Sequence, residues 1–116
     1  MSLREQILAC QDIQRERVEM LEWGVTLEVR GMTALQRARF LQESIDAKGK
    51  VDMEKLYPEL AIMSIFDPET GEQVFTNGDR EELNQKSGAA LERIAQVAMR
   101  LSGLTAEAIG EAKKDF

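Results

Sequence analysis

The 116-residue sequence contains no histidine and a single cysteine, Cys10. Without histidine there is no Ser-His or Cys-His pair for nucleophilic catalysis and no imidazole ligand for a metal ion. One cysteine excludes an intramolecular disulfide, which is typical of proteins from a reducing compartment. No base or basic cluster accompanies Cys10 in the sequence, so we expect it in the core or at an interface rather than as a reactive thiol.

Clusters of basic residues and long apolar runs are also missing. Lysine and arginine number 15 against 21 aspartate and glutamate residues, which gives a net charge of −6. A duplex nucleic acid needs concentrated positive charge to displace its counterions, and anionic lipid repels an acidic surface. No apolar stretch has the length of a spanning helix or the form of a signal peptide. We therefore expect a cytoplasmic protein that binds neither nucleic acid nor membranes.

Recognisable sites for small ligands are absent as well. The glycines are isolated from one another, so no glycine-rich phosphate loop is present. The acidic clusters at 67–72 and 81–82 are interpreted as solvated charge in a turn and in a helix first turn. Residues 67–72 lack the alternating ligands and distal glutamate of a calcium loop. The sequence thus predicts no catalytic residue, no metal site and no cofactor, and a protein that is not an enzyme.

Two kinds of periodicity indicate that residues 1–31 form a short helix and a β-hairpin. Apolar residues recur at helical spacing within residues 2–12, namely at Leu3, Ile7 and Cys10. Apolar and polar residues then alternate in 17–20 and again in 25–30, on either side of a short link. This pattern is typical of a hairpin with one buried face. Trp23, in the link, is expected to close one end of the core.

The middle of the chain predicts two further helices. Residues 33–47 begin with Thr33 and Gln36 at the spacing of a capping box. The expected inward stripe of this helix consists of Ala34, Leu35, Ala38, Leu41 and Ile45. Residues 53–76 are predicted to hold a helix followed by a second hairpin. Pro58 is tolerable there because it lies near the start of the helix.

The second hairpin is predicted from two apolar-rich stretches at 62–66 and 73–76. Between them, Asp67–Gly71 has the composition of a turn. Proline presets φ, glycine supplies a positive φ, and the Asp67 side chain can accept a hydrogen bond from its own backbone.

Residues 79–114 are predicted to form the C-terminal helices. Asp79 is the expected cap of the first of them, with an acidic residue three positions later. Ser87 is the expected cap of a longer helix that Gly103 ends. The inward stripe of that helix consists of Leu91, Ile94, Ala95, Ala98 and Leu101. A final short helix is expected from Thr105.

Together these elements predict an α+β fold that is mainly α-helical, in which an N-terminal β-hairpin and a second short hairpin pack on several amphipathic helices. The hydrophobic fraction of 43% and the charged fraction of 31% are values of a globular chain. The length predicts one domain over residues 1–116.

Several segments, taken in order, resemble the tail assembly chaperones of lambda-like long-tailed bacteriophages. These segments are Leu3–Leu8, Glu22–Thr33, Ile65–Phe75, Ser87–Ile94 and Arg100–Thr105. None of them carries chemistry, so the resemblance depends on their order and spacing over nearly the whole chain.

The resemblance implies a protein that binds the tape measure protein before tail tube subunits polymerise around it. Such chaperones are made in two lengths by a programmed ribosomal frameshift, and the extension of the longer form recruits tube protein. The resemblance also implies a homo-oligomer that works in the host bacterial cytoplasm and leaves before the virion is complete.

Two features of the C-terminus bear on this resemblance. The lysine pair Lys113 and Lys114 follows an alanine, and its codons would suit a slip of the ribosome by one base. The alternative is that the two lysines complement the end of a helix. The expected contact surface for the tape measure protein is the last pair of helices, centred on Leu101, Leu104 and Ile109. Amphipathic helices can cover the apolar stripes of a long helical partner, and repeated weak contacts add through avidity.

Other functions stay open at this point. A permanent minor structural component of the tail would share the same composition. A regulator that neutralises a basic partner would also suit the acidic charge.

Overall fold

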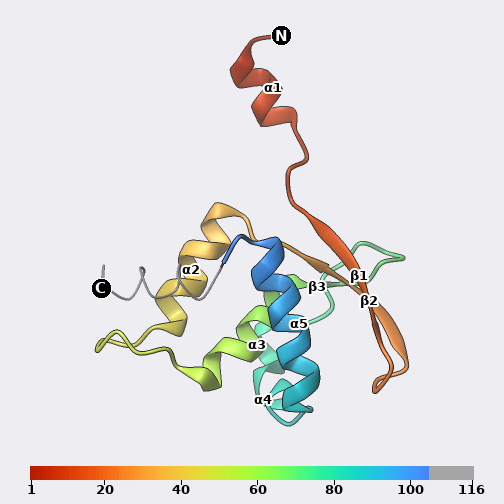
Figure 1. Ribbon diagram of the computed structural model, residues 1–116, viewed down its shortest axis with the longest axis vertical. Helices are drawn as coiled ribbons and strands as arrows, with labels where there is room; N and C mark the ends of the chain where they lie inside the picture. The colour runs from red at the N-terminus through yellow and green to blue at the C-terminus, as the bar shows by residue number, and fades with distance from the viewer. Residues whose placement is uncertain (105–116) are drawn as a thin grey trace.

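The structure is a computed structural model, and it describes residues 1–104 of the chain. The elements in order are α1 (Leu3–Ala9), β1 (Arg15–Met20), β2 (Val25–Arg30), α2 (Ala34–Ser44), α3 (Met53–Ser64), β3 (Ile65–Phe66), the 3-10 turn η1 (Asn77–Asp79), α4 (Arg80–Leu83) and α5 (Gly88–Leu101). Helices α2 to α5 pack beside a small sheet, and α1 stands apart from both (Figure 1). The expected α+β, mainly helical fold with an N-terminal hairpin is confirmed.

The three strands form an antiparallel sheet in the order β1-β2-β3. The hairpin register pairs Val18 with Leu27 and Met20 with Val25, so the apolar residues of both strands share one face. Helix α5 packs against this face. Strand β3 pairs with only two residues of β2, Glu28 and Val29.

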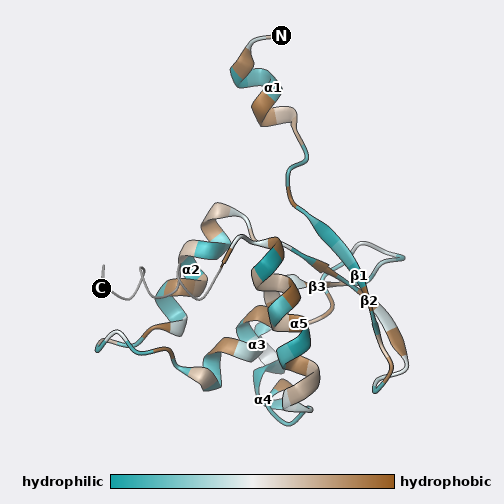
Figure 2. Cartoon of the chain, viewed as in Figure 1, coloured by the Kyte–Doolittle hydropathy of each residue, from teal (hydrophilic) through white to brown (hydrophobic). Residues whose placement is uncertain are grey.

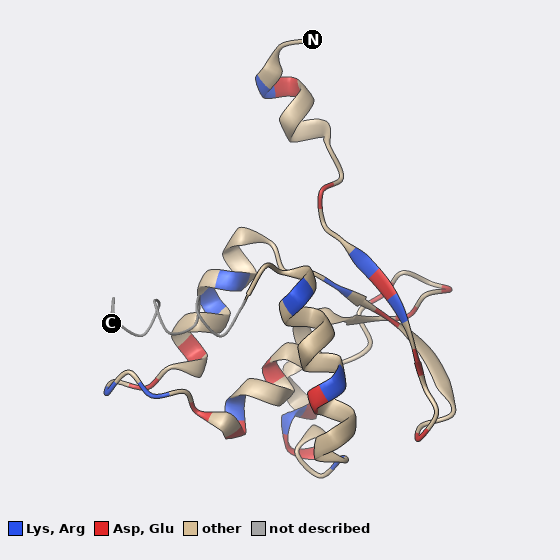
Figure 3. Cartoon of the chain, in the orientation of Figure 1, with Lys and Arg blue, Asp and Glu red and all other residues tan. Residues whose placement is uncertain are grey.

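The opposite face of the sheet is charged. Arg15 and Arg30 both lie near the Glu28 carboxylate, at N–O distances of 3.9 and 2.6 Å. The Arg30 guanidinium also lies over the Phe66 ring, 4.0 Å from its centroid. Figure 3 shows the alternation of the two signs of charge along β1. This face is therefore polar, with Glu28 and Arg30 partly covered, and the apolar core lies on the helical side.

The core is formed by α2, α3, α5 and the inner face of the sheet. Its largest fully buried side chains are Phe40, Met20, Leu60, Ile65, Ile94 and Val29. On α5 the small side chains of Ala95 and Ala98 are buried beside Leu91 and Ile94, which lets the helix approach its neighbours closely. The predicted stripe of this helix is confirmed, with Leu101 half-buried at its end.

Local signals in the sequence placed several boundaries correctly. Thr33 and Gln36 form the capping box of α2, with both reciprocal hydrogen bonds present. The Ser87 hydroxyl accepts from the Ala90 N–H at the start of α5. At the turn after β3, the Asp67 carboxylate accepts from the Glu69 N–H at 2.8 Å. Gly71 has a φ of 76°.

The expected stripe of α2 is right for Leu41 and Ile45, which pack in or against the core, and wrong for Ala34, Leu35 and Ala38. Phe40 and Ser44 are the buried residues of the helix. Ala34 and Ala38 face solvent, and Leu35 is 60% exposed. Phe40 has the most apolar area to remove from water, so its burial sets the rotation of the helix.

The second hairpin is also shorter than expected. Residues 62–64 continue α3, where the Ser64 hydroxyl donates to the Leu60 carbonyl. Strand β3 therefore begins only at Ile65, and the returning segment is joined to it by a single bridge between Phe66 and Gln73. A short apolar run is compatible with the buried end of a helix as well as with a strand, and its periodicity does not distinguish between these two structures.

Two further expectations are corrected. The Asp79 carboxylate accepts from the Thr76 N–H at 2.8 Å, so it closes η1 one turn before α4 and makes no cap for α4. The first helix ends at Ala9 and buries none of its residues. Cys10 is exposed, so it does not lie in the core, and its place at an interface stays a prediction.

Candidate functional site

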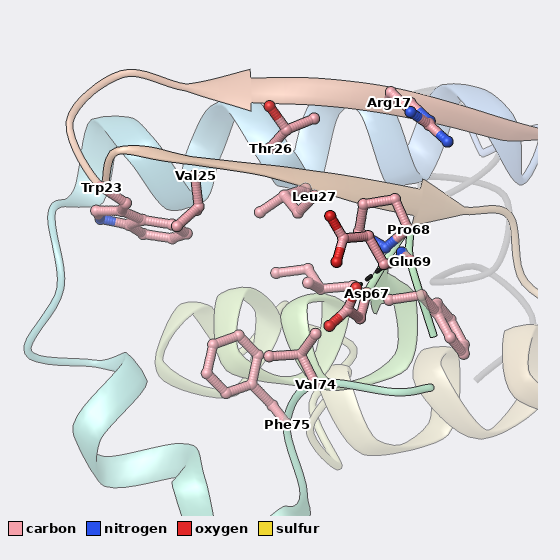
Figure 4. Close-up of a pocket in the computed structure, with 12 residues that line it drawn as sticks. Arg17, Trp23, Val25, Thr26, Leu27, Asp67, Pro68, Glu69, Val74 and Phe75 are labelled. Carbon is pink, nitrogen blue, oxygen red and sulfur yellow. Dashed lines mark hydrogen bonds between the residues drawn. The ribbon is translucent and has the colours of Figure 1, made fainter. Parts of the chain in front are cut away.

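The candidate site is a groove beside β2, at the point where the sheet loses its third strand. The register of β2 with β3 stops at Glu28, because the chain turns away at Asp67. Val25, Thr26 and Leu27 consequently have β1 on one side and no strand on the other within residues 1–104. The far wall is the returning segment that carries Val74 and Phe75, as Figure 4 shows.

This groove, which we call the Trp23–Phe75 groove, has a volume of about 580 Å³. Ligand clefts in proteins cover roughly 300–1,000 Å³. The lining residues are Arg17, Trp23, Val25, Thr26, Leu27, Ile65, Phe66, Asp67, Pro68, Glu69, Val74 and Phe75. Most of them are apolar, and Val25 and Val74 are 50% and 47% exposed. The groove thus offers aliphatic and aromatic surface that the chain itself leaves uncovered.

The hairpin turn places Trp23 at one end of the groove. The Trp23 backbone N–H donates to the Met20 carbonyl at 3.1 Å, and Gly24 allows the tight return with a φ of 66°. Trp23 and Phe75 are both half-buried against the core. A second hollow of about 390 Å³ shares these two residues and continues toward Leu83 and Lys86. The expectation that Trp23 closes one end of the core is confirmed, and its ring also lines this surface.

The other end of the groove is polar. Asp67 is held by hydrogen bonds from the Glu69 and Thr70 N–H groups, while the Glu69 carboxylate makes no ion pair inside residues 1–104. Arg17 lies on the β1 side. Charges at one end and apolar side chains along the rest are typical of a site that binds a polypeptide segment with an apolar face.

An ion pair fixes the hairpin turn over α5. Glu22 at the turn pairs with Arg93 of α5, and Glu16 pairs with Arg100 further along the same helix, at 2.7 Å. Hydrogen bonding to the backbone lowers the pKa of Glu22 below 4.5, and the Arg93 guanidinium lowers it further. Because these pairs are exposed, they contribute little to the stability of the fold, and their main effect is to orient the turn.

Over the described part of the chain, no group of three cysteine, aspartate or glutamate side chains could hold a metal ion. No helix in residues 1–104 is long and apolar enough to cross a membrane.

The residues singled out from the sequence lie elsewhere. Leu104 is buried in the core at 4% exposure, and Leu101 packs half-buried against the core. Leu104 is therefore used inside the fold, whereas Leu101 keeps part of its side chain exposed. Ile109, Lys113 and Lys114 lie outside the described residues. The groove was missed because Val74 and Val25 were assigned to strands, where half of the residues are expected to face outward.

Comparisons with known proteins give one informative result. No family model matches the chain, and no curated protein does. The fold is similar to that of the tail assembly chaperone of bacteriophage HK97. The two structures superpose with a TM-score of 0.60 over 84% of this chain and 95% of the other, at 19% sequence identity. The resemblance drawn from the sequence is therefore confirmed at the level of the fold.

Proposed function

We propose that this chain is a tail assembly chaperone of a long-tailed bacteriophage, and that it binds the tape measure protein during tail assembly. The observation that carries the proposal is the fold shared with the HK97 chaperone over nearly the full length of both chains. The sequence segments that resemble lambda-like tail assembly chaperones support the same family.

The Trp23–Phe75 groove supplies a physical mechanism. A tape measure protein awaiting its tube is a long polypeptide with exposed apolar stripes, which aggregate unless they are covered. The groove would take apolar side chains from such a stripe, and the acidic surface of the chaperone would keep the complex soluble. Each groove buries little area, so many copies along one client would act through avidity.

The finer parts of the proposal follow the resemblance. A longer frameshifted form would recruit tail tube protein, and copies of the chaperone would form a homo-oligomer. The protein would act in the host bacterial cytoplasm, without a cofactor and without catalysing a reaction. It would bind neither nucleic acid nor membrane, in keeping with its net charge of −6.

Co-expression with the tape measure protein of the same phage tests the proposal. The expected result is that the chain raises the soluble fraction of the tape measure protein several-fold and is recovered with it. Val74→Glu places a charge in the groove and should abolish the rescue. Leu35→Glu is the matched control, since Leu35 is exposed on α2 away from the groove. No rescue by the native chain would refute the proposal.

A permanent structural component of the tail is the alternative. It makes the opposite prediction for the finished particle. Mass spectrometry of purified virions should detect no copies of a chaperone, whereas a structural component would be present at constant stoichiometry with the tube protein.

A further inference from the structure

Helix α1 exposes an apolar face that its own chain does not cover. Leu3 and Ile7 are one helical turn apart on the same face, and Leu8 points to an adjoining side of the helix. These three side chains are 72%, 62% and 68% exposed. Figure 2 shows the apolar segments of α1 with no other element beside them. Exposed aliphatic side chains grouped on one short helix are a feature of docking segments.

The tether of α1 keeps it away from the Trp23 end of the groove of its own chain. The Gly31 N–H donates to the Gln14 carbonyl at 2.9 Å, which fixes the chain at Gln14. Residues 10–13 then span at most about 14 Å. Trp23 lies at the far end of the hairpin, about 20 Å along β1. In Figure 1 the helix and the hairpin turn lie at opposite ends of the hairpin.

The free helix and the open groove complement each other. Three aliphatic side chains on one helix suit an apolar groove of about 580 Å³. Arg4 on α1 and Glu69 at the polar end of the groove carry opposite charges, and neither makes an ion pair within residues 1–104. We propose that α1 of one copy occupies the Trp23–Phe75 groove of a second copy.

This contact joins two different surfaces, so it is heterologous. The copy at one end of the assembly keeps a free helix, and the copy at the other end keeps a free groove. These two ends either bind further copies, which gives an open chain, or bind each other, which closes a ring. This contact rests on the proposed function, because α1 and the tape measure protein would compete for the same groove. A single short helix buries an area at the transient end of protein interfaces, so we expect dissociation constants of about 10–100 μM.

Complementation between two full-length variants tests the contact. Ile7→Glu disables the helix and leaves the groove intact. Val74→Glu disables the groove and leaves the helix intact. Both residues are more than 40% exposed, so both variants should fold, as circular dichroism and thermal unfolding will check. Val25→Glu is a second groove variant if Val74→Glu unfolds.

Analytical ultracentrifugation at several hundred micromolar gives the readout. The native chain should sediment as a concentration-dependent series of oligomers, and each variant alone as a monomer. A mixture of the two variants should form a 1:1 dimer and nothing larger, because only one helix and one groove remain active. Leu35→Glu should behave as the native chain.

Three results would overturn the inference: a native chain that stays monomeric, variants that still form oligomers, or a mixture that stays monomeric. A symmetric contact between two α1 helices would give the second of these results, because Val74→Glu alone would still dimerise through its intact helix. The experiment contains no tape measure protein, so it can fail while the chaperone proposal stands, and the reverse also holds.

Discussion

Gly31 lies directly against the backbone carbonyl of Leu101, and a Cβ atom at position 31 would lie 2.7 Å from that oxygen. Beside this contact, the Met32 N–H donates to the Ser102 hydroxyl at 2.9 Å. The end of β2 is thus joined to the end of α5, two segments some seventy residues apart in the chain. The close approach depends on the missing side chain at Gly31.

Gly31→Ala should destabilise the protein by about 1–3 kcal/mol, the usual cost of forcing a methyl group into a packed contact. Urea unfolding followed by circular dichroism measures the change. Gly88→Ala is the matched control, because a Cβ there meets no heavy atom within 4 Å. Since Gly88 is the first residue of α5, this control substitution should leave stability unchanged or raise it by up to about 1 kcal/mol. Equal effects at the two positions would contradict the contact.

Arg80 forms an ion pair with the carboxylate of the buried residue Glu59. The Glu59 side chain is 6% exposed and the Arg80 side chain 37%. Arg80→Met leaves a carboxylate buried without its partner. It should lower the free energy of unfolding, measured with urea, by about 2–4 kcal/mol. The double variant Arg80→Met/Glu59→Met should lose less free energy of unfolding than Arg80→Met alone, because Glu59→Met removes the buried charge.

The exposed pair of Arg100 and Glu16 provides the comparison for that measurement. Its side chains are 60% and 40% exposed. Arg100→Met should therefore change the free energy of unfolding by less than about 1 kcal/mol. If Arg100→Met lowered the free energy of unfolding as much as Arg80→Met does, burial of the ion pair would not determine the size of the loss.

The features that the sequence predicted well are those that depend on a few neighbouring residues. The capping box at Thr33, the cap at Ser87 and the turn at Asp67 each arise from a side chain that bonds to backbone within three residues. Such bonds need no knowledge of the rest of the fold.

The features that it missed depend on contacts between distant segments. The rotation of α2 is set by the burial of Phe40, and the helical state of Ile62 by its place in the core. The groove exists because β3 stops after two residues while β2 continues, a difference in strand length that alternation does not reveal. The isolation of α1 was missed for the same reason, since its apolar face has the pattern of any packed helix.

The pKa of Glu22 makes a small part of the stability depend on pH. Hydrogen bonding to the backbone, and then Arg93, hold this pKa below 4.5 in the folded state. The folded state therefore binds the proton less readily than the unfolded state. The stabilisation is present above pH 4.5 and is lost as the pH falls through the lowered value. Glu22→Gln should reduce stability at neutral pH, and the difference from the native chain should vanish in acid.

The Arg93→Met variant separates the two causes of this shift. Because the backbone hydrogen bond is the larger cause, the pKa of Glu22 should rise in this variant and still stay below 4.5. Carboxyl NMR chemical shifts followed through a pH titration measure it directly. A return to the ordinary value on loss of Arg93 alone would assign the whole shift to the ion pair.

Trp23 is the only tryptophan of the chain and lines the groove, so its fluorescence reports directly on occupancy. A partly exposed indole that becomes covered by apolar side chains loses contact with water, and its emission moves to shorter wavelength. The full-length Ile7→Glu variant has a free groove and no competing helix, and a synthetic peptide of residues 1–12 is the ligand. We expect a saturable shift with a midpoint at about 10–100 μM peptide. The same peptide with Ile7→Glu should give no shift, and the Val74→Glu variant should not respond to the native peptide. A shift that persists in the Val74→Glu variant would place the binding surface elsewhere on the molecule.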